Sequence, residues 1–173
     1  MAASPSNSPL FISICRIADV ILLVFFIFIS VVAPLIDAQT CISSRFFPHV
    51  LVDVKSQYGR EYGDFLMVEK PGFFVGVVWM ELLFQWPLAI ANAYGILRKR
   101  SWYTTTCLMY GVSTCTGMAA ILGELVGSDK ASNKLLMMYL PFLGISIMAI
   151  LRGLVSCPSS TPVNTARKGE KRD

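Results

Sequence analysis

The stretch Val20–Ile36 reads VILLVFFIFISVVAPLI, and it decides the fold class. It is part of an apolar run from Leu10 to about Ile36. A hydrocarbon core about 30 Å thick needs roughly 20 apolar residues as a helix, and this run supplies them. Arg16 and Asp19 lie near its start, where they can reach the interface or pair at a spacing of three residues. The run predicts a transmembrane helix.

A cleaved signal peptide is the alternative interpretation of this first run. The run is longer than a usual signal-peptide core, and the segment LIDAQT (Leu35–Thr40) is a poor small-x-small cleavage site. We therefore favour a retained helix.

Three more apolar runs follow, at about 73–97, 104–126 and 135–155. Hydrophobic residues make up 54% of the 173 residues and charged residues 15%, against about a quarter in soluble domains. Pro34, Pro87 and Pro141 each fall inside a run, where proline removes a backbone donor and kinks a helix. These features predict an all-α membrane protein, a four-transmembrane-helix bundle with kinked helices and an intramembrane pocket.

The segments between and beyond the runs are polar. Residues 38–72 form a long connection, in which Pro48 to Tyr62 could make a short amphipathic helix on the membrane surface or folded back over the bundle. We expect a disordered tail at 1–9, a membrane domain at 10–155 and a basic cytosolic tail at 156–173. With both termini in the cytosol, nine of the 15 basic residues lie on the cytosolic side, as the positive-inside rule favours.

Other residue patterns narrow the function classes. The basic residues form no nucleic-acid-binding stripe. The five cysteines make no CxxC pair and His49 is the single histidine, which argues against a disulfide framework, a zinc site or another metal centre, and we expect no cofactor. In the third run the pairs Ser113/Gly117, Ala119/Gly123 and Gly123/Gly127 predict close helix packing in lipid.

Two carboxyl groups are the candidates for chemistry, because charges inside a membrane are costly and usually functional. Asp37 ends the first run, Glu81 lies within the second, and Gln85 follows Glu81 by one helical turn. Both carboxyls can lie at similar depth in one bundle. A buried pair favours one neutral acid that donates a hydrogen bond to one carboxylate, and the carboxylate can bind a cationic amine. Alternatively, Glu81 and Gln85 only bond neighbouring helices, and Asp37 lies in the headgroup region or caps a helix.

Four segments together resemble the sigma-2 receptor family of EXPERA-domain proteins, which also includes the emopamil-binding sterol isomerase. They are Asp37 after the first run, YGREYGD (58–64), ELLFQWP (81–87) and YLPF (139–142). The resemblance covers roughly residues 10–155. It implies a four-helix bundle in the endoplasmic reticulum membrane, often dimeric, with an occluded pocket that opens towards the bilayer.

The resemblance also implies roles for individual residues. Asp37 would pair with a ligand amine, Glu81 would hydrogen-bond Asp37, and Asp64 would hold the long connection in place. Tyr58, Gln85 and Tyr139 match positions near the family pocket. Phe142 and Gly117 stand where the receptor has a tyrosine and a threonine, which predicts a less polar pocket.

The resemblance favours a receptor or binding protein for sterol-like lipids or hydrophobic amines over an enzyme. The sterol isomerases carry a histidine one turn before the second-span glutamate, and here that position is Val77. The family role implied is sterol homeostasis or trafficking in contact with membrane lipids, including control of a lysosomal cholesterol transporter as a membrane-protein partner. A sterol isomerase and a membrane scaffold or trafficking partner are the alternatives.

Overall fold

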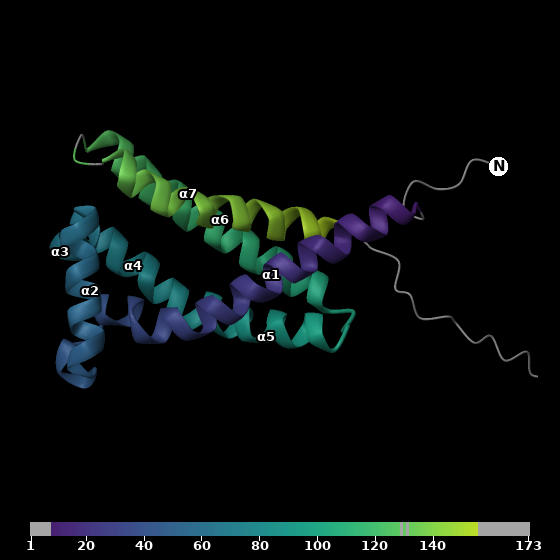
Figure 1. Ribbon diagram of the computed structural model, residues 1–173, viewed down its shortest axis with the longest axis horizontal. Helices are drawn as coiled ribbons and strands as arrows, with labels where there is room; N and C mark the ends of the chain where they lie inside the picture. The colour runs from purple at the N-terminus through teal and green to yellow at the C-terminus, as the bar shows by residue number, and fades with distance from the viewer. Residues whose placement is uncertain (1–7, 129, 131, 156–173) are drawn as a thin grey trace, which may run out of the picture.

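Four long apolar helical spans make up the bundle. The computed structural model describes residues 8–128, 130 and 132–155. Within these residues, the spans long and apolar enough to cross a membrane are Pro9–Thr40, Gly72–Leu97, Tyr103–Gly127 and Asn133–Leu154. They run side by side along the long axis of the molecule (Figure 1). The predicted all-α, four-span membrane bundle is confirmed. The predicted tails lie outside the described residues, except Ser8 and Pro9.

The first span consists of α1 (Pro9–Leu35) and the 3-10 helix η2 (Asp37–Thr40). Ser8 caps α1 by accepting a hydrogen bond from the Phe11 N–H at 3.2 Å, and Pro9 begins the helix, where its missing N–H costs nothing. Leu22 and Phe26 are fully buried in the bundle, whereas Val24 is 64% exposed. The exposed apolar side of α1 therefore faces lipid.

The second span changes helix type in its middle. It consists of α4 (Gly72–Met80), a π-helical turn η4 (Glu81–Gln85) and α5 (Trp86–Leu97). The Trp86 N–H bonds to the Glu81 carbonyl, five residues back. Pro87 cannot donate a backbone hydrogen bond, so nothing forces the turn before it into α geometry. The wide turn places Glu81 and Gln85, its first and last residues, towards the bundle interior.

The third and fourth spans, α6 (Tyr103–Gly127) and α7 (Asn133–Leu154), approach each other closely. A Cβ atom at Gly111 would lie 2.7 Å from the Ile150 backbone nitrogen, and one at Gly153 would lie 2.6 Å from the Leu108 Cβ. Only glycine permits this spacing. The predicted packing at Ala119/Gly123 and Gly123/Gly127 is wrong, because a Cβ at either glycine meets nothing within 4 Å. These glycines do not lie at a helix contact.

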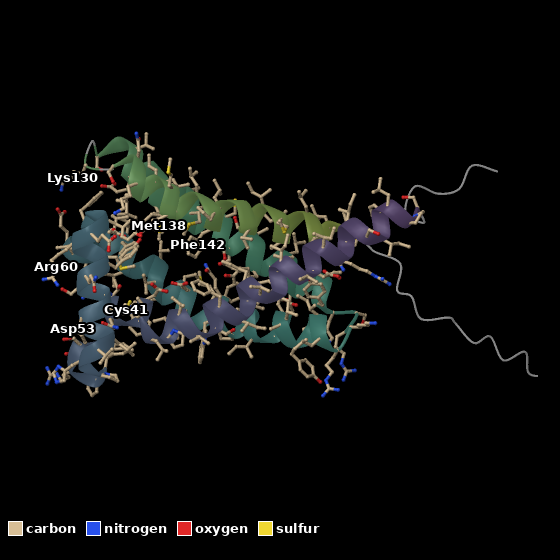
Figure 2. The ribbon with its side chains drawn as sticks, in the orientation of Figure 1. Cys41, Asp53, Arg60, Lys130, Met138 and Phe142 are labelled. Carbon is tan, nitrogen blue, oxygen red and sulfur yellow. The ribbon has the colours of Figure 1, made fainter. Side chains whose placement is uncertain are left out.

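The long connection covers one end of the bundle. It contains the 3-10 turn η3 (Ser44–Phe46) and the helices α2 (His49–Tyr62) and α3 (Phe65–Glu69). In Figure 1, α2 crosses the end of the bundle, and Figure 2 shows Asp53 and Arg60 on its outer side. The Gln39 side-chain amide donates to the Leu51 carbonyl at 3.2 Å. The predicted amphipathic helix is therefore confirmed in its folded-back form.

At the opposite end, a charge cluster joins three spans. Arg152 on α7 donates to both oxygens of Asp19 on α1, from Nε at 2.7 Å and from Nη2 at 3.1 Å. The Tyr103 hydroxyl on α6 donates to the same carboxylate at 3.1 Å. Asp19 thus pairs across the bundle instead of with Arg16, which is exposed. Arg16 and Asp19 share a helix, but Arg152 on the facing helix α7 binds the Asp19 carboxylate in a bidentate manner.

The cysteines correct one expectation. Cys15 is disulfide-bonded, whereas Cys41, Cys107 and Cys115 carry free thiols.

Candidate functional site

A cavity of about 290 Å³ lies inside the bundle, and Tyr58 of α2 is among its lining residues. Its walls are mostly aliphatic and aromatic side chains from α1, α4, α6 and α7, among them Phe28, Phe74, Ile121 and Phe142. The volume is at the lower end of the roughly 300–1,000 Å³ of ligand pockets. A few polar groups interrupt the apolar lining, as in pockets that orient one end of a ligand.

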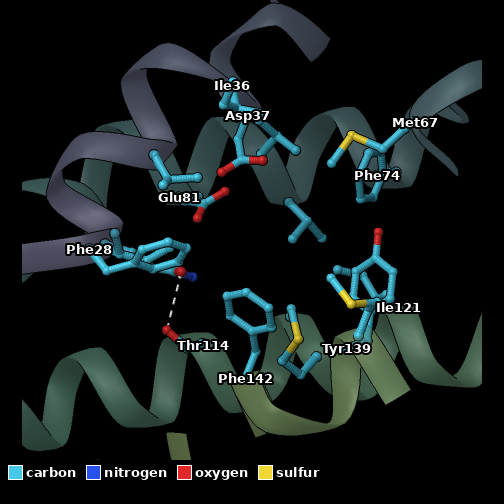
Figure 3. A pocket seen from close by; sticks show the side chains of 18 of the residues that line it. Phe28, Ile36, Asp37, Met67, Phe74, Glu81, Thr114, Ile121, Tyr139 and Phe142 are labelled. Atoms are coloured by element: carbon cyan, nitrogen blue, oxygen red, sulfur yellow. Dashed lines mark hydrogen bonds between the residues drawn. The ribbon is translucent and has the colours of Figure 1, made fainter. Parts of the chain in front are cut away.

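Two carboxyl groups stand at one side of this cavity. Asp37 begins η2 and Glu81 begins the π-helical turn η4, and both line the cavity. Figure 3 shows the two carboxyl groups pointing towards each other across the space between α1 and the second span. Among the described residues, no backbone or side-chain donor forms a hydrogen bond to either carboxyl. Their oxygens are therefore available to a ligand.

Gln85 fixes the wall next to Glu81. Its amide nitrogen donates to the Ser113 hydroxyl at 3.0 Å. Its oxygen accepts from the Thr114 hydroxyl at 3.2 Å, the hydrogen bond drawn in Figure 3, so both ends of the amide are bound to α6. Thr114 also lines the cavity. The hydroxyl expected to be missing at Gly117 is thus supplied one turn earlier, and the polar lining is larger than the sequence predicted.

Asp64 has a positioning role in the structure. It is fully buried at the N-terminus of α3, where Oδ1 accepts from the Leu66 and Met67 N–H groups at 3.1 and 3.2 Å. Oδ2 accepts from the Tyr139 hydroxyl at 2.7 Å. Asp64 does not line the cavity, whereas Tyr139 and Met67 do. These hydrogen bonds hold the covering segment against α7, and a role of Asp64 in ligand binding stays a prediction.

The inner face of α2 closes the polar end of the cavity. Tyr58 lines the cavity, and Lys55, three residues earlier on the same face, donates from Nζ to the Thr40 hydroxyl at 2.7 Å. Burial, followed by the nearby charge of Lys70, lowers the pKa of Lys55 to about 8. Burial, followed by the charge of Asp64, raises the pKa of Tyr58. Tyr58 is therefore neutral, and Lys55 titrates near physiological pH.

A second hollow lies on the outer face, between the second span and α6, and measures about 780 Å³. Three of its lining residues, Val77, Gln85 and Gly117, also line the inner cavity. A Cβ at Gly117 would come within 3.3 Å of Val77 Cγ1. The wall between the cavity and the bilayer side is therefore one side chain thick at this place.

Seven of the eight residues predicted to bind a ligand meet around one cavity; their binding role stays a prediction. They are Asp37, Tyr58, Glu81, Gln85, Gly117, Tyr139 and Phe142. The eighth, Asp64, lies behind the wall. Sequence reasoning missed Thr114 and Lys55. Thr114 lies among many small polar residues of α6, and nothing marks it out. The spacing of Lys55 from Tyr58 was the one signal that could have placed it at the site.

A family match and individual relatives both place the chain among known proteins of one kind. Residues 50–153, more than half of the chain, match the family described as EXPERA (EXPanded EBP superfamily). The chain is 24% identical over 135 residues to "Sigma intracellular receptor 2" of Xenopus tropicalis, covering 70% of this chain and 79% of that protein. It is 29% identical over 100 residues to the proteins of that name from Macaca fascicularis and Homo sapiens. These alignments cover 56% of this chain and 57% of each primate protein.

Proposed function

We propose, from the premise that the chain belongs to the EXPERA (EXPanded EBP superfamily) family, that this multi-pass membrane protein is a non-enzymatic receptor for sterol-like lipids or hydrophobic amines. The observation that carries the proposal is the cavity inside the bundle, apolar except for a few polar groups and with two facing carboxyls at one side. The family predicted from the sequence is confirmed, and the curated relatives carry the receptor name that the resemblance indicated.

The chemistry of the lining supports this ligand class. Aromatic and aliphatic walls such as Phe74, Ile121 and Phe142 can enclose a rigid apolar ring system, whose transfer from water contributes roughly 25 cal/mol per Å². Asp37 and Glu81 can then accept a hydrogen bond from a hydroxyl or pair with an ammonium group. A ligand with one polar end and a rigid apolar body matches both parts of the cavity.

The arrangement gives weaker support to an isomerase. Moving a double bond requires a proton donor and a proton acceptor placed on the ring. Val77 lines the cavity one turn before Glu81, so a side chain there would face the ligand, and valine transfers no proton. His49 is at the exposed start of α2. If expression of this protein fully restored sterol isomerisation in cells that lack that activity, the result would favour an isomerase function instead.

The proposal is tested by binding of tritiated cholesterol to the purified protein in lipid nanodiscs. We expect saturable binding of one sterol per chain. Gly117→Phe should abolish most of it, because the ring would fill the cavity next to Val77. Gly123→Phe is the matched control, since the same change on the same helix meets open space. Uptake equal to that of protein-free nanodiscs would remove the binding function and leave a scaffold role.

We further propose that the protein lies in the endoplasmic reticulum membrane with both termini in the cytosol. Four spans put the two ends of the chain on one side, and the distribution of Lys and Arg favours the cytosol. A glycosylation acceptor fused after residue 173 should stay unmodified, and modification there would reverse the topology. Regulation of sterol trafficking through a membrane-protein partner, and a homodimer, stay predictions from the resemblance.

A further inference from the structure

We propose that Lys55 is a built-in competitor for Asp37, and that it makes the pocket select an uncharged hydroxylated ligand over a cationic one. The proposal rests on the proposed function, because it names which of the two ligand classes the site prefers. Lys55 belongs to α2, outside the four spans, and it does not itself line the cavity.

The geometry of η2 brings the two charges together. Lys55 Nζ is 2.7 Å from the Thr40 hydroxyl oxygen. Asp37 and Thr40 are the first and last residues of η2. In a 3-10 helix the side chains of residues three apart eclipse, about 6 Å apart along the axis. Lys55 therefore stands at the face of η2 that carries Asp37, near enough for the two charges to interact.

The position of Lys55 is fixed by more than one contact. Thr40 is 6% exposed, and its hydroxyl is also 3.9 Å from the Met67 sulfur, which lines the cavity. The adjacent Gln39 bonds to the Leu51 carbonyl of α2. The helix that carries Lys55 is thus tied to η2 at two successive residues. Movement of the Lys55 ammonium away from η2 breaks its hydrogen bond to Thr40.

The other charged and titratable groups around Lys55 do not replace it as a cation at Asp37. Lys70 donates to the Gln39 carbonyl at 3.1 Å and is otherwise exposed. Asp64 is engaged by two N–H groups and Tyr139. The Cys41 thiol lies 3.6 Å from the Val75 carbonyl oxygen, and burial raises its pKa, so it stays neutral. Among the described residues, Lys55 is the cation whose charge acts on Asp37.

This arrangement has a direct consequence for ligand choice. An ammonium ligand must share the Asp37 charge with Lys55 or displace it, and both cost affinity. A hydroxyl needs only a hydrogen bond and meets no repulsion. Two like charges about 6 Å apart at an effective dielectric constant of about 20 repel enough to change binding by about tenfold or more.

The test compares cholesterol with 3β-aminocholest-5-ene, which share one ring system and differ in the polar head. Both are bound to the full-length protein in phosphatidylcholine nanodiscs at pH 7. Lys55→Met removes the charge and keeps the length of the side chain. We expect amine affinity relative to cholesterol to rise about tenfold or more. Lys134→Met is the matched control at the same end of the molecule, where Lys134 pairs with the exposed Glu61, and it should leave the ratio unchanged.

A pH series provides a second readout. As the pH rises through about 8, Lys55 loses its proton, so wild-type affinity for the amine should rise between pH 7 and 9. The primary amine of the probe keeps its proton over most of this range. Lys55→Met should show a smaller rise, and the difference between the wild type and this variant is the contribution of Lys55.

Two results would overturn the inference. An unchanged ratio of amine to cholesterol affinity in Lys55→Met shows that Lys55 does not compete. An equal loss of affinity for both ligands in Lys55→Met shows that Lys55 only holds α2 in place. In either case wild-type binding persists and the proposed function stands. Absence of binding of both sterols to the wild type would instead remove the proposed function itself.

Discussion

Asp37→Asn is expected to lower the affinity for 3β-aminocholest-5-ene by about 30-fold or more. The substitution keeps the shape of the side chain and removes its charge at the cavity wall. Loss of one partner of a buried, hydrogen-bonded charge pair costs about 2–5 kcal/mol, and each 1.4 kcal/mol is tenfold in affinity. Cholesterol, which needs only a hydrogen-bond partner, should lose less than about threefold.

Glu81→Gln should have a smaller effect on the amine, because the amide can still donate a hydrogen bond to the Asp37 carboxylate that it faces. Glu124→Gln is the control, since Glu124 is an exposed carboxyl on α6 that does not line the cavity. Competition binding in nanodiscs measures the affinity of all three variants for the amine and for cholesterol. Wild-type affinity for the amine in both Asp37→Asn and Glu81→Gln would show that the carboxyl pair is not the polar anchor.

Arg152→Met is expected to lower the thermal unfolding midpoint in detergent by roughly 10 °C, from a loss of about 3–5 kcal/mol. Arg152 and Asp19 form a two-pronged ion pair, with side chains 10% and 26% exposed. Removing the guanidinium leaves the Asp19 charge within a membrane span, where the Tyr103 hydroxyl is its one remaining partner among the described residues. The first span then loses its polar contact with the fourth.

Two further variants distinguish the contribution of the ion pair to stability from a general effect of removing a charge. Asp19→Leu combined with Arg152→Met removes both charges and should recover most of the lost stability, because no unpaired charge remains. Arg16→Met changes an exposed arginine one turn from Asp19 and should shift the midpoint little. Equal midpoints for Arg16→Met and Arg152→Met would show that the pair contributes nothing specific.

The fold was predictable because each transmembrane span can be recognised from its own run of apolar residues. A run such as Val20–Ile36 must be a helix in lipid, whatever its neighbours are. Contacts between spans were not predictable in the same way. Small residues at i and i+4 allow close packing, but the sequence does not say which face meets a partner, so Gly123 was chosen wrongly and Gly111 was missed. The π-helical turn at Glu81–Gln85 was also missed, because proline indicates only a disturbed helix.

In the candidate site, too, residues that are unusual within their own segment could be predicted, and residues that matter only through distant contacts could not. Glu81 and Gln85 stand out in sequence because polar groups are costly within a span, and they do line the cavity. Lys55 did not stand out, and Asp19 was expected to reach the interface or to pair with Arg16. Lys55 lies in a connection already rich in charges, and its importance depends on α2 folding across η2. The partner of Asp19 is 133 residues away, and only the assembled bundle brings Arg152 to it.

The central claim is that a sterol-like ligand occupies the cavity between the four spans. Photolabelling with a diazirine-bearing cholesterol, followed by mass spectrometry of the labelled peptides, tests it most directly. We predict label on cavity-lining residues such as Phe74, Val78 and Ile121, competed by excess cholesterol and lost in Gly117→Phe. Label confined to lipid-facing side chains such as Val24 and Leu83, unaffected by competitor, would contradict the claim.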